Sequence, residues 1–197
     1  MNPFHSKGKL LPRVLLVGVF LLSLLRGLGV GKPEGSVALY HLNGNAKDSL
    51  SEQSGTLIGG VEYGLGISGD GVRVEGGGYV QLGWDQRLDR QEFTIEAWVR
   101  RRNLAQAGVH PLGVGVIFGG SAKGYSLVLT REGQLYMSHV GIYSVYATGR
   151  IIDTEWHHVA MVRAGTTLRF YIDGQPAGTV EYATQFEFVG PYAIGAI

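Results

Sequence analysis

The sequence of 197 residues contains no cysteine, which excludes disulfide bonds and membrane attachment through a lipid-modified cysteine. Charged residues are few, at 17% of the chain, and beyond the first thirty or so residues no helical periodicity of useful length is present. The chain is instead rich in glycine and tyrosine, with 32 and 10 residues, a composition typical of short strands joined by tight turns. We therefore expect an all-β protein whose body of about 160 residues buries a self-sufficient core.

The beginning of the chain differs from the rest. Three basic residues within the first 13 positions precede the apolar run Val14–Leu25, and glycines follow it. These are the three parts of a secretory signal peptide, so we predict a leader over residues 1–31 and cleavage after Gly29 or Gly31. An uncleaved anchor is the alternative route to a membrane, but a span needs about 20 apolar residues and Arg26 ends this run early. We therefore predict that the protein is secreted and lies outside the cell, at the cell surface or in the periplasm.

The overall net charge of +1 is misleading, because five of the 17 basic residues and none of the acidic residues precede Pro33. From Pro33 onward, 12 basic and 16 acidic residues give a net charge of −4, which argues against nucleic acid as a partner. The one basic cluster, Arg100–Arg102, is predicted to be a solvated strand end.

Several segments show strand patterns. Trp156–Gly174 contains two runs of strand length separated by an Ala-Gly turn, which predicts a β-hairpin. Phe93–Arg100 alternates apolar and polar residues, as a half-buried strand does. Two shorter runs, Val72–Glu75 and Tyr79–Leu82, are predicted to form a hairpin around three consecutive glycines. Short strands at this spacing favour a sandwich or jelly roll.

Five segments, in this order, resemble one family. They read LYHLNGNAKDS, GDGVRVEGGGYVQL, FTIEAWVR, EWHHVAMVRAGTTLRFYIDGQPAG and YAIGA, and they are similar to the laminin-G-like domain of the concanavalin A-like lectin/glucanase superfamily. The resemblance implies an antiparallel β-sandwich of the jelly-roll type over residues 32–197. Domains of this family usually continue past YAIGA into a last strand with an acidic pair. The resemblance therefore implies a C-terminally incomplete domain with an unpaired sheet edge.

The resemblance also implies a candidate calcium site. Some members of the family hold calcium in the loop after the first strand, and here that loop contains Asn43 and Asp48. Calcium takes about six to eight oxygen ligands from carboxylates, amides and backbone carbonyls. Asn43 stands where the family pattern implies Asp, so Asp48 supplies the one carboxylate. The alternative is that both residues make turns and local hydrogen bonds.

His157 and His158 suggest a metal-binding or catalytic pair. Adjacent strand residues point to opposite faces, however, so the two side chains cannot chelate one ion. We expect both histidines to be structural and Trp156 to fill the core.

A sugar-binding face is the main functional hypothesis. Glu96 and Trp98 lie on the non-core side of one predicted strand, and Arg169 and Tyr171 on that of another. If the strands are neighbours, aromatic rings lie beside charged groups. The apolar face of a sugar packs on a ring, while its hydroxyls bond to carboxylate and guanidinium groups. The alternative is that loops cover this face and Trp98 is ordinary packing.

No catalytic constellation is recognisable in the sequence. Glycoside hydrolysis needs two carboxyl groups about 5 to 9.5 Å apart, but the same-face neighbours of Glu96 are Thr94 and Trp98. Signatures of serine, cysteine, phosphate-loop and zinc enzymes are also absent. We therefore predict an exported, non-catalytic module that binds carbohydrate or a surface protein. A glycan hydrolase and a structural domain of a larger surface protein are the alternatives.

Overall fold

The computed structural model describes residues 15–23, 35–105, 107–108, 112–120 and 122–195, and for 15–23 it describes the backbone alone. The strands are β1 (Leu15–Ser23), β2 (Ala38–Tyr40), β3 (Thr56–Leu65), β4 (Asp70–Gly83), β5 (Phe93–Arg101), β6 (Gly115–Gly120), β7 (Tyr125–Leu129), β8 (Gln134–His139), β9 (Tyr143–Arg150), β10 (Trp156–Ala164), β11 (Thr167–Ile172), β12 (Gln175–Glu181) and β13 (Tyr192–Ile194). A short 3-10 helix, η1 (Gln86–Leu88), follows β4. Among the described residues, no helix is long and apolar enough to cross a membrane.

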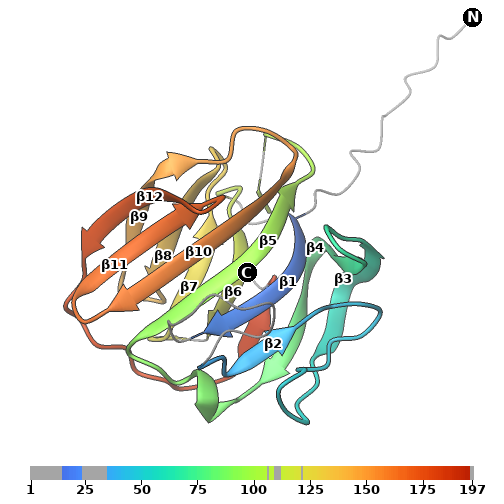
Figure 1. Cartoon of the computed structure of the whole chain (residues 1–197), viewed down its shortest axis with the longest axis horizontal. Coiled ribbons are helices and arrows are strands. Elements are labelled where there is room, and N and C mark those ends of the chain that lie inside the picture. The colour runs from blue at the N-terminus through green and yellow to red at the C-terminus, as the bar shows by residue number, and fades with distance from the viewer. Residues whose placement is uncertain (1–14, 24–34, 106, 109–111, 121, 196–197) are drawn as a thin grey trace, which may run out of the picture.

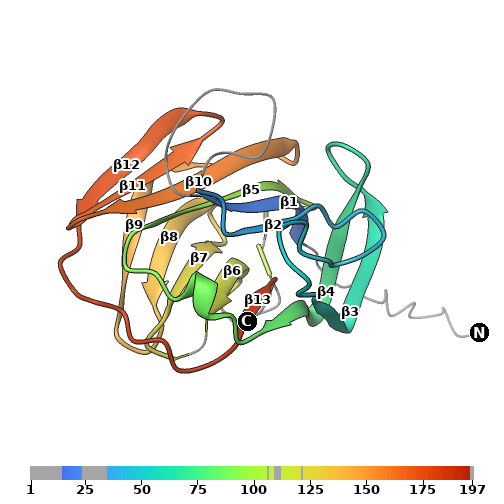
Figure 2. The ribbon, with the colours of Figure 1, turned by 60° about the horizontal axis from the view of Figure 1, so that its bottom comes forward.

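The strands form two layers that face each other across the core (Figures 1 and 2). One layer has the order β12-β11-β10-β5-β1-β4, and the other has the order β13-β6-β7-β8-β9. β4 pairs with β13 as well as with β1 and β3, so it joins the two layers. The predicted all-β antiparallel sandwich is therefore confirmed.

Strand alternation fills the core from both layers. On β5, the predicted inward positions Phe93, Ile95, Ala97 and Val99 are at most 3% exposed. The predicted hairpin of β10 and β11 is also confirmed, with Leu168 paired to Arg163 across the turn. From the opposite layer, Tyr125, Leu127, Leu129, Leu135 and Met137 are fully buried. Because the inner faces of β5, β10 and β11 contribute to this continuous core, their opposite faces are left for solvent.

The predicted hairpin around Gly76–Gly78 is wrong. β4 continues through these glycines and pairs with β3 on both sides of them, with a register shift between Ile58 and Gly60 of β3. Gly76 and Gly77 have φ angles of 56° and 79°, which favour glycine. A Cβ on Gly78 would lie 2.7 Å from the carbonyl carbon of Gly60, so the two backbones approach each other closely. The glycines therefore permit an irregular, closely paired β3–β4 ribbon.

β1 lies inside one layer, between β5 and β4 (Figure 1). Its backbone is in register with Thr94–Arg101 of β5 on one side and with Val72–Val74 of β4 on the other. These residues belong to the predicted signal peptide, and the rest of that segment lies outside the described residues. A continuous apolar run is typical of both a leader and a buried strand. This explains why the same residues are predicted as a signal peptide and form β1 in the structure. Cleavage of the leader and a missing last strand both stay predictions.

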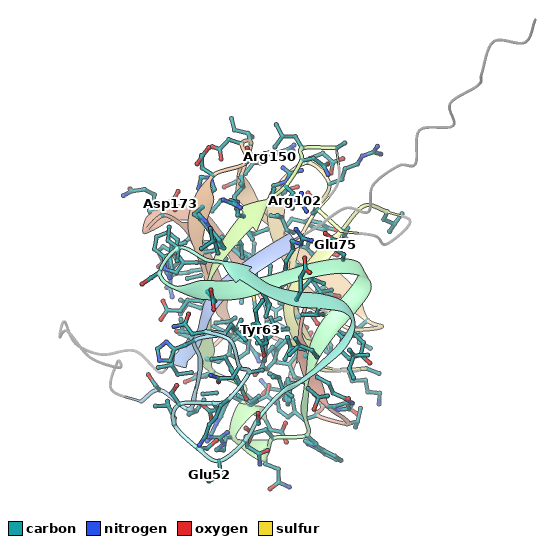
Figure 3. The ribbon with its side chains drawn as sticks, turned by 90° about the vertical axis from the view of Figure 1, so that its right-hand side faces the viewer. Glu52, Tyr63, Glu75, Arg102, Arg150 and Asp173 are labelled. Carbon is teal, nitrogen blue, oxygen red and sulfur yellow. The ribbon has the colours of Figure 1, made fainter. Side chains whose placement is uncertain are left out.

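The basic cluster does not form the predicted solvated strand end. Arg101 is 2% exposed, and its guanidinium donates to the carbonyl oxygens of Ile151 at 2.8 Å and Leu104 at 3.0 Å. Arg102 lies on the outside, with its Nη1 3.3 Å from Oε1 of Glu75 (Figure 3). Strand alternation separates the three arginines, and backbone carbonyls replace water around the inward one.

Candidate functional site

The four candidate ligand-binding residues share one face of the sheet, although their strands are not direct neighbours. β10 lies between β5 and β11 and completes the face. Across β5 and β10, Trp98 pairs with His158 and Arg100 with Trp156. Across β10 and β11, Ala160 pairs with Tyr171 and Val162 with Arg169. We call this surface the aromatic face; its residues are Glu96, Trp98, Arg100, Trp156, His158, Arg169 and Tyr171, and all seven are partly exposed.

Contacts within the aromatic face hold its rings in place. The rings of Trp98 and His158 meet edge to face, with centroids 5.4 Å apart. Nε2 of His158 lies 3.4 Å from Oε2 of Glu96. The guanidinium of Arg100 lies over the Trp156 ring, 5.2 Å from its centroid. Trp98 and His158 thus support each other laterally, Arg100 covers part of the Trp156 ring, and all three rings stay partly exposed.

The contribution of β10 to this face was not predicted from the sequence. The prediction that Trp156 fills the core is wrong. Its side chain lies on the same side of the sheet as Trp98 and is partly exposed. The two histidines do face different neighbours, as strand alternation predicts. His158 contacts Glu96 and Trp98, whereas His157 lies between Asp153 and Asp173.

His157 forms a small charged cluster on the other side of β10 from the aromatic face, near the start of the strand. Its Nδ1 lies 2.7 Å from Asp173, and its Nε2 lies 2.8 Å from Asp153. Burial alone would lower the pKa of His157, but the hydrogen bonds and charges of the two carboxylates outweigh it and raise the pKa. The cluster ties the chain before β10 to the turn between β11 and β12.

The raised pKa of His157 predicts a pH dependence of stability. An unfolded histidine titrates near a pKa of about 6.5, so the extra stability is fully present below that pH and is lost as pH rises through the higher folded pKa. We expect His157→Gln to destabilise the domain by roughly 1 kcal/mol at pH 5.5 and by less above the folded pKa. Urea unfolding of both proteins across this range measures the difference. A gap that grows toward high pH contradicts the assignment.

Asp48 of the candidate calcium site is fully buried and its carboxylate is engaged by protein donors. It accepts from the backbone of Leu39 at 2.8 Å and of Leu50 at 3.0 Å, from Ser51 Oγ at 2.6 Å and from Arg87 Nη2 at 2.9 Å. Burial would raise the pKa of Asp48, but these hydrogen bonds outweigh it and lower the pKa. Arg87 therefore places a positive charge beside Asp48, and it shares that charge with Asp85.

Asn43 of the candidate calcium site is exposed and has a different neighbour. Its Oδ1 accepts from the backbone N–H of Asp70 at 2.7 Å, which fastens the loop after β2 to the start of β4. Among the described residues, no group of three or more His, Asp or Glu side chains is gathered around a possible metal position. Asn43 and Asp48 thus make hydrogen bonds within the protein, as the alternative interpretation predicted. Calcium binding stays a prediction.

Comparisons with known proteins agree with this fold. Residues 74–196 match a laminin-G-type family model described as the concanavalin A-like lectin/glucanases superfamily. Domain 4 of AbnA, a GH43 extracellular arabinanase from Geobacillus stearothermophilus solved in complex with arabinotriose, has a TM-score of 0.63 at 15% identity, over 92% of this chain and 84% of that one. The carbohydrate-binding module CBM66 from Bacillus subtilis has a TM-score of 0.46 at 12% identity, over 72% and 87%.

A β-glucanase from Bacillus licheniformis is a more distant match, with a TM-score of 0.36 at 11% identity, over 89% of this chain and 80% of that one. No protein of curated function matches the sequence. At 15% identity, the arabinanase domain supports the fold alone. The family model covers more than half of the sequence. The chain therefore belongs to the concanavalin A-like lectin/glucanase superfamily.

Proposed function

We propose that this chain is an exported, non-catalytic domain that binds carbohydrate through the aromatic face. The observation that carries the proposal is the convergence of Trp98, Trp156 and Tyr171 with Glu96 and Arg169 on one accessible sheet surface. Rings of this kind pack against the C–H face of a sugar, and charged groups beside them bond to its hydroxyls. The similar arabinanase domain, solved with arabinotriose, supports a glycan as the ligand class.

Export is the second part of the proposal. The apolar run Val14–Leu25 and its flanking residues have the composition of a secretory leader. The similar domain of known structure comes from an extracellular enzyme, which supports the same location. A binding domain outside the cell has access to polysaccharides too large to enter it.

Hydrolysis is less well supported than binding. On β5, Glu96 has Thr94 and Trp98 as its same-face neighbours, so the strand carries no pair of carboxylates at alternate positions. The nearest charged partner of Glu96 is His158, with which it forms an ion pair when the histidine is protonated. If reducing sugar is released from any polysaccharide and Glu96→Gln abolishes the release, the domain is an enzyme and the proposal is wrong.

Substituting Trp98 tests the binding face. We expect Trp98→Ala to lower affinity for the bound polysaccharide at least about tenfold, because a large ring at the centre of a contact surface carries much of the binding energy. Affinity electrophoresis in gels containing arabinan, xylan or mixed-linkage β-glucan measures the loss, and circular dichroism checks the fold. Loss of the fold together with binding would show that Trp98 has a packing role instead.

A further inference from the structure

We infer that a second carbohydrate contact lies at the end of the sandwich, where β4 leads into η1, and that Trp84 is its platform. This inference rests on the proposed function but concerns a different surface. Trp84 is 58% exposed, whereas Trp98 is flanked by His158 and Trp156 lies under Arg100. Among the described residues, Trp84 is therefore the tryptophan whose ring is most open to a ligand.

The Trp84 ring is anchored from one edge. Its Nε1 donates to Oδ2 of Asp89 at 3.4 Å, and Oδ1 of Asp89 accepts from the hydroxyl of Tyr192 at 2.7 Å. Tyr192 is 2% exposed and belongs to the core. The indole is thus connected through Asp89 to a rigid part of the molecule. Because little ring motion is lost on binding, a ligand that stacks on it has a small entropic cost.

The backbone on both sides of Trp84 is also fixed. Gly83 has a φ of 77°, a conformation that favours glycine, and it turns the chain out of β4. Asp85 caps η1, and its carboxylate accepts from the backbone N–H of Arg87 at 3.0 Å. The exposed position of the ring therefore follows from the turn between two regular elements.

Trp84 borders a hollow of about 430 Å³ that is otherwise lined by Gln53, Asp85 and Gln86. This size lies within the range of small-ligand sites. Glu52, the neighbour of Gln53, projects at this end of the molecule in Figure 3. Gln53 and Gln86 are exposed, so both amides are available as donors and acceptors.

The charges around the hollow argue against an anionic ligand. The carboxylate of Asp85 is bound by the guanidinium of Arg87, with Nε at 3.0 and 3.1 Å from its two oxygens. Arg87 also pairs with Asp48 at 2.9 Å, so this group of one guanidinium and two carboxylates keeps a net negative charge. Asp89 adds another carboxylate at the edge of the Trp84 ring, and an anionic ligand is therefore disfavoured. An indole face beside two neutral amides fits an uncharged sugar ring, which stacks on the indole while its hydroxyls bond to the amides.

The test compares Trp84→Ala and Trp98→Ala in the full chain, with Ile152→Ala as a control at another exposed apolar residue, 72% exposed. The probes are soluble arabinan, xylan and mixed-linkage β-glucan. We expect Trp84→Ala to weaken binding at least about tenfold without changing the thermal unfolding, and Ile152→Ala to have no effect. In the wild type, the bound polysaccharide should also protect Trp84 from oxidation by N-bromosuccinimide, measured by mass spectrometry of its peptide.

The outcomes separate the two proposals. If Trp84→Ala binds as the wild type does while Trp98→Ala does not, the Trp84 site is wrong and the aromatic face stands. If Trp84→Ala alone loses binding and Trp84 is protected, the second site is supported and the aromatic face is wrong. If the wild type binds none of the three polysaccharides and Trp84 is oxidised equally with and without them, both proposals are overturned.

Discussion

A chain that begins at Pro33 is expected to lose cooperative unfolding and to associate, because it lacks β1. In the folded protein, β1 lies between β5 and β4 and pairs with both. Its removal leaves the backbone of Thr94–Arg101 without partners on that side and opens the sheet beside the buried Val72 and Ile95. The net stability of a domain is only about 5–15 kcal/mol, so the loss of a central strand is enough to unfold it. Unpaired strand edges then favour association.

Thermal unfolding and light scattering of residues 1–197 and 33–197, side by side, measure this effect. Leu21→Pro in the full chain provides a second variant, because proline within a central strand removes a ladder hydrogen bond. Leu21→Val is its matched control. If the shortened chain is a monomer that unfolds in one transition at nearly the temperature of the full chain, β1 is not an integral strand. In that case the apolar run has only the role of a leader.

Cleavage of residues 15–23 on export and their place as β1 in the sheet are compatible only if another strand replaces β1. A strand that is removed on export leaves a gap between β4 and β5 that another strand has to fill. Mass spectrometry of the exported protein shows whether cleavage after Gly29 or Gly31 takes place. An exported domain that is cleaved, monomeric and stable would show that its sheet closes without β1.

The second large effect is expected for Arg87→Met, which leaves the fully buried carboxylate of Asp48 without its positive partner. Removing one member of a buried ion pair costs about 3–5 kcal/mol, because the remaining charge stays desolvated. For a domain of this size, that loss corresponds to a fall in unfolding temperature on the order of 10 °C. Chemical unfolding followed by circular dichroism gives the free energy directly.

Two further variants control this prediction. Arg90→Met removes a nearby exposed guanidinium and is expected to change stability by less than about 0.5 kcal/mol. Asp48→Asn in the Arg87→Met background removes one of the two carboxylate charges that lose Arg87, the other being that of Asp85, and is expected to restore part of the loss. Equal losses for Arg87→Met and Arg90→Met would contradict the role of Arg87. Repeating the measurements with calcium tests whether Asn43 and Asp48 hold the ion.

The alternating pattern of the sequence was sufficient to place Glu96, Trp98, Arg169 and Tyr171 on non-core sides, because the period of two fixes each strand's inner face. It could not show that β10 lies between the two strands, since strand order depends on contacts distant in sequence. The apolar run after Trp156 also favoured a core position for that ring. The register with β5 places it outside instead.

Other features depend on tertiary contacts that no local pattern encodes. Arg101 and Arg87 look like surface residues by type, and only the carbonyls and carboxylates brought to them by the fold explain their positions. Gly76–Gly78 have the composition of a turn, but the pairing of β3 with β4 keeps the strand continuous. Trp84 did have a local signal, namely a tryptophan between a glycine and an aspartate at a strand end.

The most direct test of carbohydrate recognition follows the three indole N–H signals in a ¹⁵N–¹H NMR titration with the glycan, each signal assigned by a Trp→Phe variant. The proposed function predicts that the signals of Trp98 and Trp156 shift together with a single saturation curve, because both rings lie on the aromatic face. A shift of Trp84 would add the second contact. If the glycan binds and neither Trp98 nor Trp156 shifts, the aromatic face is not the binding site.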